Sequence, residues 1–570
     1  MSAGTDTTST THDYRHRAHG TGAAAAAEDP HILDAIAATL ARGGNAVDSA
    51  IAGAAVQGVC RPMSGGLGGG GFMLIHQPTG RTVVVEHREQ AASTFGPDSL
   101  AEDGVVLPVA ERRVHGASVG VPGALRAWHE AQRLYGQLRL ADVLEPAIAL
   151  AEVGFEVDPT LHAEIAERRD DFAMFESTAA LYLDEHGEAL PVGTTLRNPD
   201  LANTYRTIAA QGIDDFYHGA LARQIVDAVN DPPYARANTR PIRPGQLSLA
   251  DLAGYQVRHL EPVRYRYAGH QLAGPPLPSS GAITIGEGLG ILDRQPAGGA
   301  DLTEQLHRYL SACRLAFADR EVFLGDSRLV DVPAIALLGE DYLTQRAAHP
   351  VGEATQPGDV RAAGAPWMAW EPESPSTIHL SVADEQGCVV SLTSTIVSMG
   401  GCGIVVPGTG ILLNDALAGR TADHGGRFGA GRPMGGMRPL SSMSPTMVFR
   451  DGRLVQTVGS PGGSTIITTV MQLLHLTLGV GMGLPEALAF PRATQDSSNG
   501  PAEAEPEFLA LDLADELRAR GNRFTEWTAP EGIGAANGLR WHPDGSVTAA
   551  AEPVRRGSGY AAVWPSTRRA

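Results

Sequence analysis

The sequence predicts an α+β protein in which helices are layered against more than one β-sheet. Three observations predict this class. Most of the first two-thirds of the 570 residues carries the apolar periodicity of helices, whereas the last third carries short β-rich runs separated by turns. Strands and helices also follow one another in mixed order instead of the regular alternation of a parallel α/β fold.

The first part of the chain is expected to begin with two helices, Ile32–Ala41 and Val47–Cys60, joined by a turn at Gly43–Asn45. Two strands, Phe72–His76 and Thr82–Glu86, follow a run of glycines. Further helices are expected at Gly123–Tyr135, Leu140–Val153, Asn203–Ala210, Leu221–Val229, Ile283–Leu292 and Leu302–Phe317, with strands at Val263–Tyr267 and His270–Ala273. Residues 359–375 are rich in Pro, Ala, Gly and Trp and are expected to form a linker.

The last third is expected to be mainly β-structure. Strands are predicted at Thr377–Val382, Val389–Ser394, Gly403–Val406, Met447–Arg450, Val455–Gly459, Gly538–His542 and Val547–Ala551, and an apolar helix at Ile466–Leu478. We expect residues 1–22 to be a disordered tail, because the first apolar run, Ala23–Ala27, is too short for a signal peptide. The Gly-rich segment Arg420–Gly436 is expected to be a mobile loop.

Composition and charge exclude several classes of function. The chain has 44 basic residues, all of them Arg, and 64 acidic residues, which gives a formal net charge of −20. This charge argues against nucleic acid or an anionic membrane as a partner. Without Lys, the chain has neither a Schiff-base Lys nor a P-loop Lys. No segment has the length and apolar character of a membrane helix, and the four scattered cysteines indicate neither a disulfide framework nor a zinc site. We therefore expect a cytoplasmic protein without a metal or cofactor.

Two glycine motifs are better explained by backbone geometry than by chemistry. Gly66–Gly71 matches G-x-G-x-x-G, but a helix precedes it and a strand follows, which reverses the dinucleotide-binding context. We expect a tight backbone crossing there. Gly116–Gly120 matches G-x-S-x-G without the adjoining strand and helix of a nucleophile elbow, so we expect a turn. His379 and His475 are expected to be hydrogen-bonded structural residues rather than bases.

The segments that carry chemistry are rich in hydroxyl groups and glycine amides. Thr377 opens a predicted strand, and Thr395 ends the run Thr393–Thr395. Two further stretches, Arg438–Thr446 and Gly459–Ser464, contribute paired serines and a Gly-Gly amide pair. A Thr that is released by chain cleavage gains an α-amine, which can act as its own general base. Such a nucleophile needs neither His nor Lys, in agreement with what this chain lacks.

Seven blocks occur along the chain in order. They are Gly43–Asp48 with Gly68–Met73, Arg88-Glu89, Val121–Gly123, Phe317–Arg320, Gly408–Asn414, Ser441–Thr446 and Gly459–Ser464. In this order the blocks resemble the γ-glutamyltransferase family of N-terminal-nucleophile hydrolases, over a span from about Ala24 to about Ala551. The resemblance implies a four-layered αββα sandwich made by a precursor that cleaves itself between Ser376 and Thr377. Residues 23–376 would then form a large chain and residues 377–570 a small chain, which stay associated as one intertwined domain.

The resemblance also implies roles for individual residues. Thr377 would be the nucleophile, its new α-amine the general base, and Thr395 the residue that orients it. The backbone amides of Gly462 and Gly463 would form the oxyanion hole. The α-carboxylate of the substrate would be bound by three residues, namely Arg88, Ser441 and Ser442.

The chain departs from the family where the family binds the glutamyl α-ammonium. An Asn, a Gln and an Asp are replaced here by Val397, Ala416 and Gly419. The carboxylate-binding residues are retained, so the pattern favours a substrate with a carboxylate but without the neighbouring ammonium, because an unpaired buried cation is costly. Asp415, beside the last block, could take the place of the missing Asp.

These departures predict an oxalyl or α-keto acid substrate, in which the attacked carbonyl lies beside the carboxylate. Two branches of the superfamily have this character: oxamate amidohydrolases, and hydrolases of antibiotic pathways that make 4-alkyl-proline units, as in lincosamides, pyrrolobenzodiazepines and hormaomycin. We favour the second branch, which cleaves a carbon–carbon bond and releases an oxalyl fragment. The alternatives are a γ-glutamyltransferase or glutathione hydrolase, a cephalosporin-acylase-like amidase with a larger apolar pocket, and a non-catalytic member.

Overall fold

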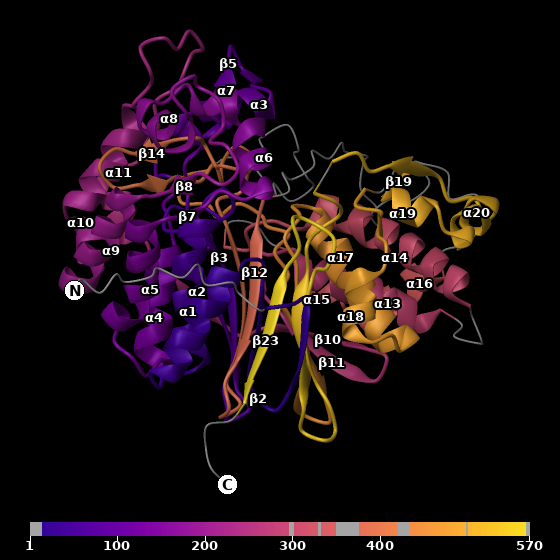
Figure 1. Cartoon of the computed structure of the whole chain (residues 1–570). Helices are drawn as coiled ribbons and strands as arrows, with labels where there is room; N and C mark the ends of the chain where they lie inside the picture. Colours follow the sequence, from indigo (N-terminus) through magenta and orange to yellow (C-terminus); the bar gives the residue numbers. More distant parts are fainter. Residues whose placement is uncertain are drawn as a thin grey trace.

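The computed structural model describes residues 14–295, 301–328, 332–348, 376–419, 434–497, 500–529 and 531–565. In these residues the chain forms two seven-stranded antiparallel sheets that face each other, and helices cover the outer face of each sheet (Figure 1). This αββα arrangement confirms the predicted α+β class. The expected linker at residues 359–375 lies outside the described residues, as does most of the expected loop Arg420–Gly436.

The first sheet contains strands from both sides of the Ser376–Thr377 bond. In spatial order its strands are β23 (Tyr560–Pro565), β2 (Gly22–Ala27), β12 (Ile378–Ala383), β13 (Val389–Thr395), β3 (Gly70–His76), β4 (Thr82–Glu86) and β9 (Arg258–Leu260). Strand β2 lies between β12 and β23, so a strand of the expected large chain is paired on both edges with strands of the expected small chain.

The second sheet is interleaved in the same way. Its strands, in order, are β1 (Arg17–Gly20), β22 (Val547–Ala551), β21 (Asn537–Trp541), β17 (Arg453–Gly459), β16 (Thr446–Arg450), β11 (His270–Gly274) and β10 (Val263–Tyr267). Successive side chains of a strand point to opposite faces, and β3 shows the consequence. Phe72 and Leu74 pack toward the second sheet, whereas Met73 and Ile75 pack toward the helices.

The helices form the two outer layers, which flank the sheets in Figure 1. The layer over the first sheet consists of α1 (Pro30–Ala41), α2 (Ala46–Cys60), α4 (Ala124–Tyr135), α5 (Leu140–Val153), α6 (Pro159–Glu167), α9 (Pro199–Gln211), α10 (Asp214–His218) and α11 (Ala220–Asn230). Helices α1, α2 and α4 contact its strands directly, and α5 and α9 pack outside them. Helix α2 is buried along its whole length, and Asn45 and Asp48 begin it with a reciprocal capping box.

The other outer layer covers the second sheet. It consists of α13 (Gly281–Arg294), α14 (Leu302–Phe323), α16 (Glu340–Ala347), α17 (Thr465–Leu474), α18 (Leu484–Ala489) and α20 (Asp512–Ala519). A π-helical segment, His475–Val480, continues α17 and accounts for the longer helix that the sequence predicts there. The main helices and strands expected from periodicity are thus confirmed, with boundaries that differ by a few residues.

Shorter elements connect the layers. The short helices are α3 (Val109–Arg112), α7 (Arg169–Phe172), α8 (Glu176–Tyr182), α12 (Leu249–Gly254), α15 (Ala334–Leu337), α19 (Pro506–Leu509) and the 3₁₀ turns Pro97–Leu100 and Gly116–Ser118. The short strands are β5 (Ala101–Glu102), β6 (Val105–Val106), β7 (Phe155–Glu156), β8 (Thr195–Leu196), β14 (Val405–Val406), β15 (Ile411–Leu412), β18 (Ala493–Thr494), β19 (Ala502–Ala504) and β20 (Phe524–Glu526).

The structure corrects the expected tail at residues 1–22. Arg17–Gly20 form the edge strand β1, which pairs with β22, and β2 begins at Gly22. Strand β1 has no apolar face, because exposed and half-buried residues alternate along it. Its ladder of backbone hydrogen bonds holds it in place, and such a ladder leaves no hydrophobic pattern in the sequence. Residues 1–13 lie outside the described residues.

The glycine run before β3 is a close backbone crossing, as predicted. A Cβ on Gly68 would lie 2.0 Å from the carbonyl oxygen of Leu412, and one on Gly69 would lie 2.1 Å from that of Thr395. Even alanine would clash with main-chain atoms at these positions. The crossing allows the end of β13 to pack directly against the start of β3.

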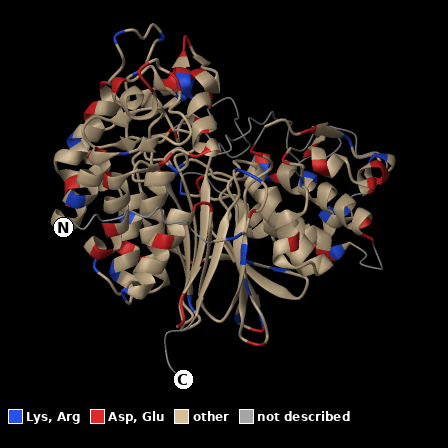
Figure 2. Ribbon diagram, viewed as in Figure 1, with Lys and Arg blue, Asp and Glu red and all other residues tan. Residues whose placement is uncertain are grey.

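Charged residues lie mainly on the outer helices and their loops, whereas the central strands carry few (Figure 2). Both signs are interspersed over the outer layers in this view. In the part of the chain that the structure describes, no helix combines the length and the hydropathy needed to cross a membrane.

Candidate active site

Thr377 lies immediately before β12, opposite the end of β13. The register pairs Ile378 with Ser394, which brings Thr377 beside Thr395. The hydroxyl oxygens of the two threonines are 3.3 Å apart, and both residues are buried. The structure therefore brings together the two threonines that the sequence analysis selects.

Both hydroxyl groups point at the Ser376 carbonyl, which belongs to the peptide bond expected to be cleaved. Thr377 Oγ1 donates to this carbonyl oxygen at 2.6 Å, and Thr395 Oγ1 donates to it at 2.7 Å. Thr395 Oγ1 in turn accepts from the N–H of Val397 at 2.8 Å. Because that N–H occupies a lone pair of Thr395, the single proton of Thr395 stays directed at the carbonyl. A carbonyl polarised in this way, with a hydroxyl beside it, is arranged for attack by the Thr377 oxygen.

Val397 adopts a backbone conformation that is costly for its residue type. Its φ is +82°, in the left-handed region that β-branched residues avoid. Strain of this kind costs about 1–3 kcal/mol and concentrates at functional sites. Here the unusual backbone turns the Val397 N–H toward Thr395.

Arg556, between β22 and β23, holds the main chain of Thr377. Its Nη1 donates to the Thr377 carbonyl oxygen at 2.8 Å, and its Nη2 donates to Ser64 Oγ at 3.0 Å. Ser376 Oγ lies 3.4 Å from the same Ser64 oxygen. Sequence reasoning missed Arg556 and Ser64, because no local pattern connects residues that are 492 positions apart.

A buried carboxylate stands beside Arg556. Glu28, which follows β2, lies with Oε2 3.9 Å from Arg556 Nη1. Burial raises the pKa of Glu28 to about 7, although the nearby charge of Arg556 acts to lower it. Sequence reasoning missed this residue as well. The cleavage junction is therefore set in a network that includes an arginine and a glutamic acid near its titration range.

Gly462 and Gly463 form the loop between β17 and α17. Their φ angles, +135° and +60°, are those that glycine adopts readily and other residues rarely. Within the described residues, neither of their N–H groups has an intramolecular acceptor. The loop thus presents two adjacent amide donors at the end of a buried strand.

Contacts between the sheets place this loop near Thr377. Thr457 Oγ1 of β17 donates to Ser381 Oγ of β12 at 3.0 Å. Two residues further along β17, a Cβ on Gly459 would meet the ring of His379 at 2.3 Å. Strands β12 and β17 therefore run in opposite directions on the facing sides of the two sheets. If this alignment continues two residues further, the glycine loop after β17 lies toward Thr377 at the start of β12.

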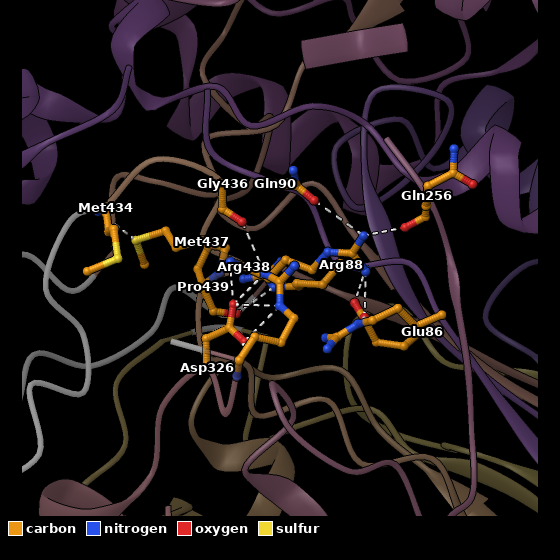
Figure 3. Close-up of polar contacts among 12 residues, drawn as sticks. Glu86, Arg88, Gln90, Gln256, Asp326, Met434, Gly436, Met437, Arg438 and Pro439 are labelled. Atoms are coloured by element: carbon orange, nitrogen blue, oxygen red, sulfur yellow. Dashed lines mark hydrogen bonds and ion pairs between the residues drawn. The ribbon is translucent and has the colours of Figure 1, made fainter. Parts of the chain in front are cut away.

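Arg88, which follows β4, lies against the segment that leads to Ser441. Its Nε donates to the carbonyl oxygen of Pro439 at 3.2 Å (Figure 3). Its Nη1 donates to Glu89 at 2.6 Å. Burial raises the pKa of Glu89, whereas the charge of Arg88 lowers it. Arg88 thus lies against the main chain two residues before Ser441.

Arg438 fixes the same segment. Figure 3 shows it between Glu86 and Asp326. Its Nη1 pairs with Glu86 at 2.5 Å, and its backbone N–H donates to Asp326 at 2.9 Å. All three residues are buried. This arginine ties the residues before Ser441 to β4 and to the end of α14.

Ser441 and Ser442 are buried, and each hydroxyl oxygen accepts a hydrogen bond from the protein. Ser441 Oγ accepts from the N–H of Met443 at 3.1 Å. Ser442 Oγ accepts from Arg320 Nη2 at 2.7 Å. The paired serines are therefore held in fixed orientations.

Comparison with known proteins decides the family. The family model described as Gamma-glutamyltranspeptidase matches residues 34–562. The chain belongs to the γ-glutamyltranspeptidase family. It is 34% identical over 537 residues to the glutathione hydrolase proenzyme of Bacillus subtilis strain 168, covering 91% of this chain and 88% of the relative. It is 35% identical over 520 residues to the Acylase ACY 1 proenzyme of Pseudomonas sp. strain SE83, covering 90% and 88%.

A solved structure agrees with this assignment. Cephalosporin acylase from Bacillus halodurans matches with a TM-score of 0.82 and 26% identity, and the match covers 99% of each chain. The γ-glutamyltranspeptidase family consists of N-terminal-nucleophile hydrolases, and the chain is an enzyme of this class. The relatives are proenzymes, which is consistent with a precursor that gives two associated chains.

Within this γ-glutamyltranspeptidase-family site, the positions expected to bind an amine are not polar. Val397 is half-buried, Ala416 is buried and Gly419 is exposed. Asp415 is buried, and its Oδ1 accepts from the N–H of Ser398 at 2.8 Å. Burial raises the pKa of Asp415, while the charges of Arg168 and Arg113 lower it. Oδ1 of Asp415 is thus engaged by the chain, whereas its buried Oδ2 has no hydrogen-bond partner among the described residues.

The motifs judged to be structural have structural partners. Ser118 lies in the 3₁₀ turn Gly116–Ser118 and donates to the His115 carbonyl oxygen at 2.7 Å, which confirms the predicted turn. His379 bonds to Thr393 Oγ1 at 2.8 Å, and burial lowers its pKa to about 3. His475 bonds to the Tyr267 hydroxyl at 2.6 Å, and burial lowers its pKa to about 4.

One group in the described residues combines His, Cys and acidic ligand atoms at close range. It consists of Asp29, His31 and Cys60. Asp29 already accepts from His31 at 2.8 Å and pairs with Arg61 at 3.0 Å. Burial raises the pKa of the Cys60 thiol far above its ordinary value. The adjacent arginine and the protonated thiol suit an ion pair in the core rather than a cation site.

Proposed function

We propose that this chain is a self-processing hydrolase that cleaves the bond beside an oxalyl or α-keto-carboxylate group. Cleavage before Thr377 would release the α-amine that accepts the proton of Thr377 Oγ1. The oxygen would then attack the substrate carbonyl, and the Gly462 and Gly463 amides would bind the oxyanion. The leaving group takes the proton, and water hydrolyses the resulting ester to release oxalate.

A contrast between two parts of the site carries this proposal. The carboxylate side keeps Arg88, whose Nε lies 3.2 Å from the Pro439 oxygen beside the buried serines. A guanidinium and two hydroxyls suit a carboxylate, because all three are hydrogen-bond donors. The amine side has Val397 and Ala416 where polar groups would be needed. Leaving an ammonium unpaired in such surroundings costs several kcal/mol.

The finer part of the proposal concerns the bond that breaks. The same attack can act on an oxalyl group that is attached through carbon. The carbon–carbon bond then breaks, its electron pair stays on the leaving carbon, and that carbon takes the proton from the α-ammonium of Thr377. The reaction consumes one water and needs no redox partner. We favour this branch because the sequence resembles the hydrolases of 4-alkyl-proline antibiotic pathways.

Two chromogenic anilides test the substrate class. We expect the purified enzyme to release 4-nitroaniline from N-(4-nitrophenyl)oxamic acid at least 100-fold more efficiently, in kcat/KM, than from γ-glutamyl-4-nitroanilide. Thr377→Ala is the control for uncatalysed release. Preference for the γ-glutamyl compound would refute the proposal and support a glutathione hydrolase with a remodelled amine site.

A restored amine site provides the converse test. We expect Val397→Asn, Ala416→Gln and Gly419→Asp together to raise the kcat/KM for γ-glutamyl-4-nitroanilide at least 10-fold. Asn tolerates the positive φ of residue 397 better than Val does, so this substitution also relieves strain. No gain from a triple variant that is processed and folded would mean that these positions do not set the specificity.

An amidase for larger acyl groups is the second candidate. The acylase relative at 35% identity and the cephalosporin acylase structure favour it, together with the apolar side chains of Val397 and Ala416. Turnover of a cephalosporin with a carboxyacyl side chain, without turnover of the oxalyl anilide, would establish this candidate in place of the first.

A further inference from the structure

The two serines of the expected carboxylate site lie against the loop before α13. Ser280 donates twice to the carbonyl oxygen of Ser441, from its Oγ at 2.9 Å and from its N–H at 2.8 Å. Ser279 Oγ donates to the carbonyl oxygen of Met443 at 2.7 Å. All of these residues are buried. The loop thus holds the main chain on both sides of Ser442.

Arg320, near the end of α14, connects this loop to the serine pair. Its Nε donates to Ser280 Oγ at 2.9 Å, and its Nη2 donates to Ser442 Oγ at 2.7 Å. Arg320 is fully buried. One planar guanidinium therefore fixes both the hydroxyl of Ser442 and the residue that holds the carbonyl of Ser441.

The direction of these hydrogen bonds determines what the serines can offer to a ligand. A serine hydroxyl has one proton and two lone pairs. Arg320 takes a lone pair of Ser442, and the N–H of Met443 takes a lone pair of Ser441. Among the described residues, neither hydroxyl has an acceptor for its own proton. Both protons are thus available to a carboxylate.

The guanidinium does more than hold the Ser442 oxygen in place. A charged donor polarises the hydroxyl that accepts from it, and in a buried chain of hydrogen bonds this makes the hydroxyl a stronger donor. The chain here would run from the Arg320 N–H to the oxygen of Ser442, and from its proton to the substrate. Lys could supply the charge but not the two fixed directions of the guanidinium fork.

We propose that Arg320 is a positioning residue of the carboxylate site, which orients and polarises Ser442 as a donor to the substrate carboxylate. The inference rests on the proposed function, because it assumes that Ser441 and Ser442 bind that group. It also gives a role to the Phe317–Arg320 block and to the serines of the loop before α13, which the catalytic reaction leaves unexplained.

A ratio of rates separates this role from a merely structural one. For each variant we would measure kcat/KM for N-(4-nitrophenyl)oxamic acid and for its carboxamide counterpart, N-(4-nitrophenyl)oxamide. We expect the wild type to prefer the carboxylate strongly. Arg320→Lys should reduce this preference at least 10-fold, mainly through KM for the carboxylate, because general loosening would affect both compounds alike.

Matched variants complete the experiment. Arg346→Lys changes another buried arginine of this helical layer, which pairs with Asp319 at 2.9 Å, and should keep the wild-type preference. Ser442→Ala should reduce the preference by itself, and adding Arg320→Lys to it should reduce it no further. Ser280→Ala is a milder substitution that removes the acceptor of Arg320 Nε, and it should lower the preference even if Arg320→Lys fails to fold.

The outcomes distinguish the two proposals. If the wild type prefers the carboxylate compound and Arg320→Lys prefers it equally strongly, only the role of Arg320 is overturned. Multiplicative losses in the double variant overturn it as well. If the wild type acts on γ-glutamyl-4-nitroanilide instead, the ratio is measured with the α-carboxamide of that compound, and only the oxalyl assignment fails. A wild type indifferent to the carboxylate overturns both proposals.

Discussion

Single residues at the cleavage junction act through the directions of their hydrogen bonds. Thr395 Oγ1 accepts from the N–H of Val397 and donates its only proton to the Ser376 carbonyl oxygen. Arg556 holds the next carbonyl along the chain, that of Thr377. The junction is therefore fixed on both sides of the bond that is expected to break, and the carboxyl group of Glu28 lies beside the arginine that fixes it.

The protonation of Glu28 leads to a prediction about stability. Burial raises its pKa from 4.5 to about 7, so the folded state binds this proton more tightly than the unfolded state does. The resulting stabilisation is fully present below pH 4.5 and is lost as the pH rises through 7. In the wild type, the free energy of unfolding should therefore fall by up to roughly 3 kcal/mol between low and high pH because of this group, and Glu28→Gln should remove that fall. Thermal unfolding at pH 5 and pH 8, followed by circular dichroism, measures it. The exposed control Glu185→Gln should show the same pH dependence of stability as the wild type. If Glu28→Gln also kept the wild-type pH dependence, the raised pKa of Glu28 would be contradicted.

At the scale of elements, the start of β3 depends on the absence of side chains. Strands β3 and β13 pair through Gly70 and Gly71, and the preceding glycines pass over main-chain carbonyl groups. This close approach sets Thr395, the last residue of β13, at the depth where it meets Thr377. The glycine run therefore belongs to the construction of the site although it contributes no functional group.

We expect Gly69→Ala to destabilise the protein by about 3 kcal/mol or more, because its Cβ would lie 2.1 Å from the Thr395 carbonyl oxygen. Gly254→Ala is the matched control, since nothing lies within 4 Å of a Cβ at that position. The thermal midpoint and the extent of chain cleavage measure the effect. Equal midpoints for the two variants would show that β3 can shift to accommodate a methyl group.

Sequence patterns predict some of these elements and miss others. Periodicity predicts helices such as α2 and buried strands such as β13, because burial leaves an apolar pattern. It misses β1, whose polar residues pair only through the backbone. Ordered motifs select Thr377 and Arg88 as candidates, whereas Arg556 lies 492 residues from Ser64 in sequence and only the fold shows their contact.

At the scale of the whole molecule, both sheets contain strands from each side of the Ser376–Thr377 bond. Intact mass spectrometry of the denatured protein tests whether that bond is cut. We expect two chains of about 39 and 20 kDa, in proportion to the parts before and after Thr377 of the 59.7 kDa precursor, and one intact chain for Thr377→Ala. Ser381→Ala, further along β12, should be cut like the wild type. A single intact mass in the wild type would contradict self-processing.

The position of β2 has a consequence for whether the two halves of a cleaved molecule could exchange with those of another molecule. This strand lies between β12 and β23, so the two halves of a cleaved molecule cannot part without opening the first sheet on both edges of β2. If the chain is cleaved before Thr377 as we expect, each molecule should keep the two halves of the precursor from which it was made. Cleaved molecules of the wild type and of an inactive variant made in the same cell should therefore remain two separate populations, because the halves would not exchange between them.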